Sequence, residues 1–109
     1  MPMDIVTREM IIRNIILVLS WEMSLDDFKK WNDAIFVDDD CEYDPNYRAI
    51  IADVLSLFDQ LFGHILGKLE GLEGFEIIAP CITEALKIHD EEKAIRYLNK
   101  CVGDLLKSS

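Results

Sequence analysis

The segment from residue 38 to residue 44 carries the side chains most able to do chemistry, because five of its seven residues are acidic. The five are Asp38, Asp39, Asp40, Glu42 and Asp44. Carboxylates this close together repel one another, so such a segment serves a metal ion, a basic partner protein or plain solvation. A metal site is the first of these to consider.

The acidic segment departs from a calcium-binding loop at the positions where such loops are most specific. Asp38, Asp40, Glu42 and Asp44 take positions one, three, five and seven of an EF-hand loop. Position six is Tyr43, where the turn needs glycine, and position twelve is Ala49, where the loop needs a bidentate glutamate. We therefore expect no dedicated metal site and no cofactor.

Catalysis has no recognisable constellation in this sequence. His64 and His89 are the two histidines, and neither forms a motif with a serine, cysteine or carboxylate. The chain also lacks a glycine-rich phosphate loop. We expect no catalytic residues; an enzymatic alternative would need a pocket around His64 or His89.

The distribution of charge points to a protein partner. The formal net charge is −10, and from Glu22 to Asp44 nine acidic residues face only Lys29 and Lys30. Nucleic acids and anionic membranes repel such a chain, whereas a basic protein attracts it. Acidic side chains concentrated in one region repel one another and destabilise the fold slightly. We therefore expect the region to have a compensating use, which is docking on a basic surface. Its expected members are the five loop carboxylates, supported by Glu22, Asp26, Asp27 and Asp33.

Two tyrosines flank the acidic turn. Tyr43 lies among charges that cannot be buried together, and an exposed tyrosine in a charged loop is typical of an interface anchor. Tyr47 is a second candidate anchor, although it can equally fold back onto the core at the start of the next helix. Both tyrosines join the expected partner-binding residues.

Helical spacing of apolar residues predicts an all-α fold, a single-domain bundle of about five helices in 109 residues. The expected helices cover residues 4–20, 25–35, 45–69, 80–88 and the chain from 90 onward. Ser24, Asp44 followed by Pro45, and Asp90 are the expected start signals. Glycines at 67, 71 and 74 predict a turn region, and no strand is expected.

The remaining side chains fit a reduced, packed interior. Apolar helical spacing places four aromatic rings in the core: Phe28, Trp31, Phe58 and Phe62. The three cysteines, Cys41, Cys81 and Cys101, show no CxxC spacing and are expected to be reduced thiols. The apolar run at residues 11–19 is too short for a membrane span and unlike a secretory signal, so we expect a cytoplasmic protein.

Residues 9–62 resemble a known family. They contain a first helix, the short break Trp21-Glu22-Met23-Ser24, a second helix that begins Leu25-Asp26-Asp27-Phe28-Lys29-Lys30-Trp31, an acidic loop and a helix from Pro45 onward. This arrangement is similar to small acidic helical bacterial immunity proteins of the colicin D and contact-dependent growth inhibition kind. The resemblance implies a non-catalytic inhibitor that covers the active site or substrate groove of a basic nuclease toxin.

A second hypothesis is a helical adaptor or regulatory domain. Such a domain would bind a partner helix through an exposed apolar groove, and the acidic loop would only keep the chain soluble. Replacement of the loop carboxylates by Asn and Gln separates the two hypotheses, because only the immunity hypothesis predicts lost binding.

Overall fold

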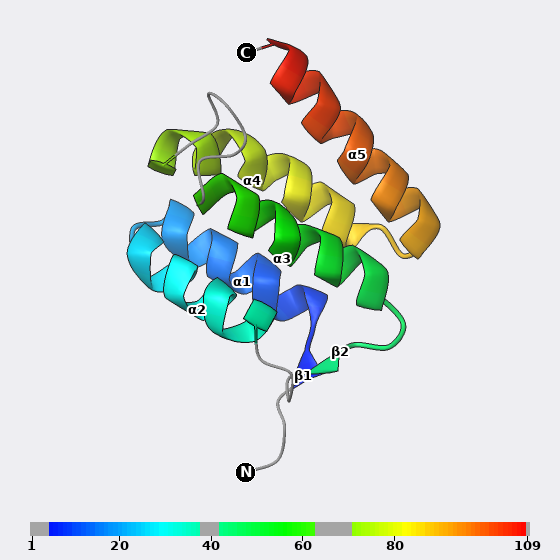
Figure 1. The fold of residues 1–109 in the computed structure, drawn as a ribbon, viewed down its shortest axis with the longest axis horizontal. Coiled ribbons are helices and arrows are strands. Elements are labelled where there is room, and N and C mark those ends of the chain that lie inside the picture. The colour runs from blue at the N-terminus through cyan, green and yellow to red at the C-terminus, as the bar shows by residue number, and fades with distance from the viewer. Residues whose placement is uncertain (1–4, 38–41, 63–70, 109) are drawn as a thin grey trace.

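A computed structural model describes residues 5–37, 42–62 and 71–108. This part of the chain forms five helices and one small parallel sheet (Figure 1). The helices are α1 (Arg8–Leu19), α2 (Leu25–Val37), α3 (Arg48–Phe62), α4 (Gly71–Lys87) and α5 (Glu91–Ser108), and the strands are β1 (Ile5–Val6) and β2 (Glu42–Tyr43). The predicted all-α bundle of about five helices is confirmed.

The two strands correct the prediction that the chain has no β structure. β1 and β2 pair in parallel, with Ile5 opposite Glu42 and Val6 opposite Tyr43. The amide of Asp44 continues the ladder and donates to the carbonyl of Val6 at 2.9 Å. Each strand has only two residues, which is too short for an alternating pattern to show in the sequence. The pairing ties the start of α3 to the start of α1.

Three helices begin at capping side chains. Thr7 Oγ1 accepts from the amide of Met10 at 3.2 Å, and α1 begins at Arg8, four residues after the expected position, because Ile5 and Val6 belong to β1. Ser24 Oγ accepts from Asp27 N–H at 3.0 Å, and Asp90 Oδ1 accepts from Lys93 N–H at 3.2 Å. The predicted caps of α2 and α5 are thus confirmed, and each satisfies an amide that the first turn leaves free.

The start of α3 differs from the prediction. Asp44 does not cap a helix at Pro45; its side chain accepts from Asn46 N–H and its carbonyl from Tyr47 N–H, both at 3.0 Å, and these bonds close a turn. α3 then begins at Arg48. Glu91 of α5 supplies the missing cap, since its Oε2 accepts from the amides of Ala49 at 2.8 Å and Ile50 at 3.2 Å. Residues 63–69, expected to continue this helix, lie outside the described residues.

α4 also begins earlier than predicted. Pro80 was expected to open the helix, and Gly71 and Gly74 to form a turn, but α4 runs from Gly71 through Pro80 to Lys87. A proline inside a helix removes one hydrogen bond and costs about 3 kcal/mol. Phe75 and Ile78 before the proline are both fully buried, and their burial offsets that cost.

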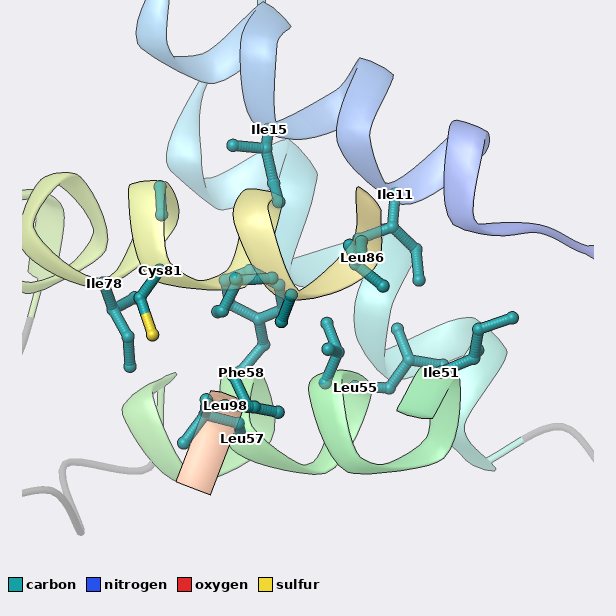
Figure 2. Packing of buried hydrophobic residues seen from close by; sticks show 14 of the residues in the cluster. Ile11, Ile15, Ile51, Leu55, Leu57, Phe58, Ile78, Cys81, Leu86 and Leu98 are labelled. Atoms are coloured by element: carbon teal, nitrogen blue, oxygen red, sulfur yellow. The ribbon is translucent and has the colours of Figure 1, made fainter. Parts of the chain in front are cut away.

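The core lies between the helices and contains side chains from all five. α3 packs against α2, α4 and α5, while α1 packs against α2 and α4 (Figure 1). Figure 2 shows side chains of α1, α3 and α4 pointing into one interior, among them Ile11, Ile15, Leu55, Phe58 and Leu86. The helices therefore share a single hydrophobic core.

The predicted packing of the aromatic rings, and the apolar surroundings predicted for Cys81 and Cys101, are confirmed where the structure describes them. Phe28 and Phe58 are fully buried, and Trp31 and Phe62 pack against the core. Cys81 is buried and Cys101 is half-buried, and both are free thiols. Burial, together with a hydrogen bond to Cys101, raises the pKa of the Cys81 thiol to about 12, so this side chain behaves as a small hydrophobe. Cys41 lies outside the described residues.

Candidate partner-binding surface

Apart from Asp33 within α2, the described acidic residues of the predicted surface lie toward the two ends of that helix. Glu22, Asp26 and Asp27, here called the turn carboxylates, are exposed around the α1–α2 turn and the first turn of α2. Glu42 and Asp44 follow the other end of this 13-residue helix. Such a helix is about 20 Å long, so the two groups form separate patches rather than one compact surface. Three further predicted members, Asp38, Asp39 and Asp40, lie outside the described residues.

Local geometry holds the turn carboxylates outward. Ser20 Oγ has one proton to donate and lies 2.8 Å from the carbonyl oxygen of Ile16 and 3.2 Å from Glu22 Oε2. Asp26 Oδ2 pairs with Lys30 Nζ at 3.3 Å, one helical turn away. Asp26 and Asp27 lie at the positive end of the α2 dipole, where negative charge is favourable. Lys29 and Lys30 are exposed on the same helix and lower the negative potential of the turn carboxylates, and the exposed Asp26–Lys30 pair itself contributes little to stability.

The acidic residues beyond the first turn of α2 are less available to a partner. Asp33 is partly buried on the same helix. Asp44 is partly buried in the turn that its own side chain closes, whereas Glu42 of β2 is exposed. The turn carboxylates are therefore the most accessible part of the predicted surface that the structure describes.

The prediction that Tyr43 stands exposed in a charged loop is wrong. Tyr43 belongs to β2, is half-buried and packs against the core, because its pairing with Val6 turns the residue inward. Tyr47 also packs against the core, in agreement with the alternative considered for it. The guanidinium carbon of Arg8 lies 3.6 Å from the centre of the Tyr47 ring, and Arg8 Nη1 donates to the carbonyl of Leu86 at 2.7 Å. Tyr47 thus helps to join α1, α3 and α4.

Trp21 is the residue of this surface that the sequence-based prediction left out. Its side chain is 80 % exposed, and its backbone has φ of 64°, in the left-handed region. Glu22 N–H donates to the carbonyl of Leu17 at 2.9 Å and Trp21 N–H to that of Val18 at 3.1 Å. This is the Schellman arrangement that ends a helix, and glycine usually occupies the position of Trp21. A bulky residue in the left-handed conformation destabilises the fold by about 1–2 kcal/mol. The sequence signal for Trp21 is a predicted helix end that has no glycine after it.

Cavities between the helices border polar groups. One, of about 440 Å³, lies between α3 and α5 and is lined by Asp53, Ser56, Leu57, Gln60, Leu98, Asn99 and Val102. A second, of about 360 Å³, lies beside α1 and is lined by Met10, Arg13, Asn14, Leu17, Met23 and Trp31. A third, of about 340 Å³, lies at the α1–α2 turn between Trp21, Glu22 and Leu72 of α4. The third includes one of the turn carboxylates, Glu22, in its lining, so it belongs to the candidate surface.

The carboxyl of Asp53 in the α3–α5 cavity gives a pH-dependent prediction. Partial burial, and then the nearby carboxylate of Glu91, raise the pKa of Asp53. A raised pKa in the folded state makes the ionised form costly, so the cost is complete above the folded pKa and disappears as pH falls below the unfolded value of about 3.9. We expect Asp53→Asn to stabilise the fold at pH 7 by up to about 0.5 kcal/mol, since solvent screens this exposed group.

Urea denaturation of wild type and Asp53→Asn at several pH values measures this gain. The gain should shrink steadily as the solution becomes acidic. Asp59→Asn, which removes an exposed charge from the same helix, serves as the control. A gain that grows on acidification would contradict the assignment.

The enzymatic alternative concerns the two histidines, and the metal alternative concerns clusters of ligating side chains. His89 is exposed in the connection between α4 and α5, and His64 lies outside the described ranges. Across residues 5–37, 42–62 and 71–108, no three His, Cys, Asp or Glu side chains gather in a way that could hold a metal ion. Within the same part of the chain, no helix has the length and apolar character needed to cross a membrane.

Comparison with protein-family models, curated proteins and solved structures finds no match to this chain. Functional inference therefore depends on the geometry and charge described above.

Proposed function

We propose that this chain is an immunity protein, similar to an antitoxin, that binds a basic nuclease toxin and covers its active site or substrate groove. The observation that carries the proposal is the exposed acidic end of the bundle at the α1–α2 turn. There Glu22, Asp26 and Asp27 lie within six residues of one another, in a chain of net charge −10. A basic protein is the partner that such a surface selects.

The electrostatics of a nuclease groove supply the reason. A groove that receives phosphates is positively charged, so carboxylates held outward on a rigid helix end can take the places of phosphates. Opposite charge also steers the encounter and raises the association rate, which suits an inhibitor that must capture a toxin before it acts. The chain needs no catalytic group of its own for this function.

The order of elements adds support. The resemblance of residues 9–62 to immunity proteins depends on a helix, a short break, a second helix, an acidic connection and a third helix. α1, the Trp21–Ser24 break, α2 and α3 follow one another in that order. The resemblance implies a basic nuclease as the partner, and a basic partner agrees with the net charge of −10 of this chain.

A direct test uses the nuclease itself. We expect the gene immediately upstream of this one to encode a toxin whose C-terminal end is variable. The C-terminal domain of that toxin is the partner to purify. We expect equimolar addition of the full chain to abolish nucleic-acid cleavage by that domain, and co-expression to protect cells from it. Undiminished cleavage at a tenfold excess of the chain would refute the proposal.

Exposed apolar residues on α1 favour one alternative. Ile16 is 54 % exposed and Leu19 is 42 % exposed, so an adaptor that binds a partner helix remains the second candidate function. Replacing Glu22, Asp26 and Asp27 by their amides separates the two. Binding that survives this change unaltered would favour the adaptor.

A further inference from the structure

The end of α1 requires a left-handed backbone at residue 21 but not the exposed indole side chain that Trp21 carries there. Its left-handed φ of 64° and the two Schellman hydrogen bonds fix the direction of the side chain. The ring is exposed, so its burial contributes little to the stability of the described fold. The backbone strain at Trp21 is therefore not offset by packing of its own side chain. Residues held in such conformations cluster at binding sites, where strain keeps a group ready for its ligand.

The surroundings of Trp21 define the chemistry of that ligand. The ring borders the cavity of about 340 Å³ whose walls include Val18, Met23 and Leu72, and Glu22 supplies a carboxylate at its edge. Asp26 and Asp27 lie in the first turn of α2 and do not line this cavity. A flat aromatic face beside the carboxylate of Glu22 suits a flat cation, because the ring attracts it through its π electrons and the carboxylate pairs with it.

Arginine meets both conditions better than lysine does. Its guanidinium group is planar, stacks on aromatic faces and forms two parallel hydrogen bonds to one carboxylate. The protein already contains such a contact, between Arg8 and the ring of Tyr47 at 3.6 Å. A second copy of this chain is a poorer occupant, since it would bring its own turn carboxylates against these.

We propose that Trp21 is the anchor of the acidic surface and takes an arginine side chain of the basic partner between its ring and the carboxylate of Glu22. This inference rests on the proposed function for the identity of the partner, but its chemistry can be tested without the toxin. It also replaces Tyr43 and Tyr47 as the expected aromatic anchors, since both pack against the core.

The first experiment titrates the full chain with hexa-arginine and hexa-lysine peptides at low salt and follows the indole N–H signals by NMR. We expect the arginine peptide to shift the Trp21 signal and to bind about threefold to fivefold more tightly than the lysine peptide. Trp21→Gly should abolish this preference. Its urea midpoint should not fall below that of wild type, because glycine accepts the left-handed backbone without strain.

Trp21→Leu is the matched variant. Leucine keeps an apolar side chain at the same backbone position but has no ring face, so it should lose the arginine preference as completely as glycine does. Retained preference in either variant, or equal binding of both peptides by wild type, would overturn the inference.

The nuclease domain then separates this inference from the proposed function. If the chain inhibits the nuclease, Trp21→Gly should weaken that complex about thirtyfold, as for a central aromatic anchor. If wild type and Trp21→Gly inhibit the nuclease with equal affinity, Trp21 is not the anchor, while the proposed immunity function is still supported. If the nuclease is not inhibited at all, the proposed function fails and the peptide titration alone decides the role of Trp21.

Discussion

Replacement of Phe28 by alanine is expected to lower the free energy of unfolding by about 4 kcal/mol. Phe28 is fully buried, and its ring centre lies 4.8 Å from that of Phe58, 5.1 Å from that of Phe75 and 5.6 Å from that of Trp31. Truncation removes these edge-to-face contacts and leaves a cavity that helices on several sides cannot all close. Since domains of this size have only about 5–15 kcal/mol of stability, between about a quarter and four fifths of it would be lost.

Urea denaturation followed by circular dichroism measures this loss. Phe36→Ala is the matched control, because Phe36 lies on the same helix but is 37 % exposed. We expect the control to cost about 1 kcal/mol or less. Similar losses in the two variants would show that the aromatic cluster around Phe28 is not the centre of the core.

The second large effect concerns association with the basic partner. We expect the association rate constant to fall at least about tenfold when ionic strength rises from about 50 mM to about 500 mM, because salt screens the field of the acidic surface. The dissociation rate should change much less, since close contacts govern it. Stopped-flow kinetics with the nuclease domain gives both rates. An association rate that is insensitive to salt would show that the acidic surface does not steer the partner electrostatically.

Sequence patterns anticipated the parts of this fold that depend on neighbouring residues. Ser24 and Asp90 cap α2 and α5 because a side chain oxygen and an amide three residues later meet in any helix start. The aromatic positions followed from helical spacing in the same way, as Phe28 and Phe58 show. Such features need no knowledge of the rest of the chain.

Features that depend on distant residues could not be predicted. α3 begins at Arg48 because Glu91, more than forty residues away, caps its amides and because the strand pairing holds Asp44 in a turn. Pro80 lies within α4 because buried residues on both sides of it hold that helix against the core. Local rules for proline and aspartate cannot weigh such contacts.

The candidate surface also combines features that neighbouring residues determine with features that distant residues determine. Composition located the excess of carboxylates, yet it could not show that Tyr43 turns inward through its pairing with β1. Trp21 had a local signal, a helix end without glycine, but only the backbone geometry shows that the residue adopts the left-handed conformation.

One measurement tests most directly whether the acidic end at the α1–α2 turn meets the basic partner. It compares the association rates of two variants that each lose three carboxylates. The first carries Glu22→Gln, Asp26→Asn and Asp27→Asn. The control carries Glu9→Gln, Glu84→Gln and Glu92→Gln, which remove exposed carboxylates from the first turn of α1, the last turn of α4 and the first turn of α5. Figure 1 shows that these three helix ends lie at the end of the bundle opposite the α1–α2 turn. We predict about a tenfold slower association for the first variant and less than about a twofold change for the control. Equal slowing of both would mean that net charge alone attracts the partner, and would contradict a binding surface at this turn.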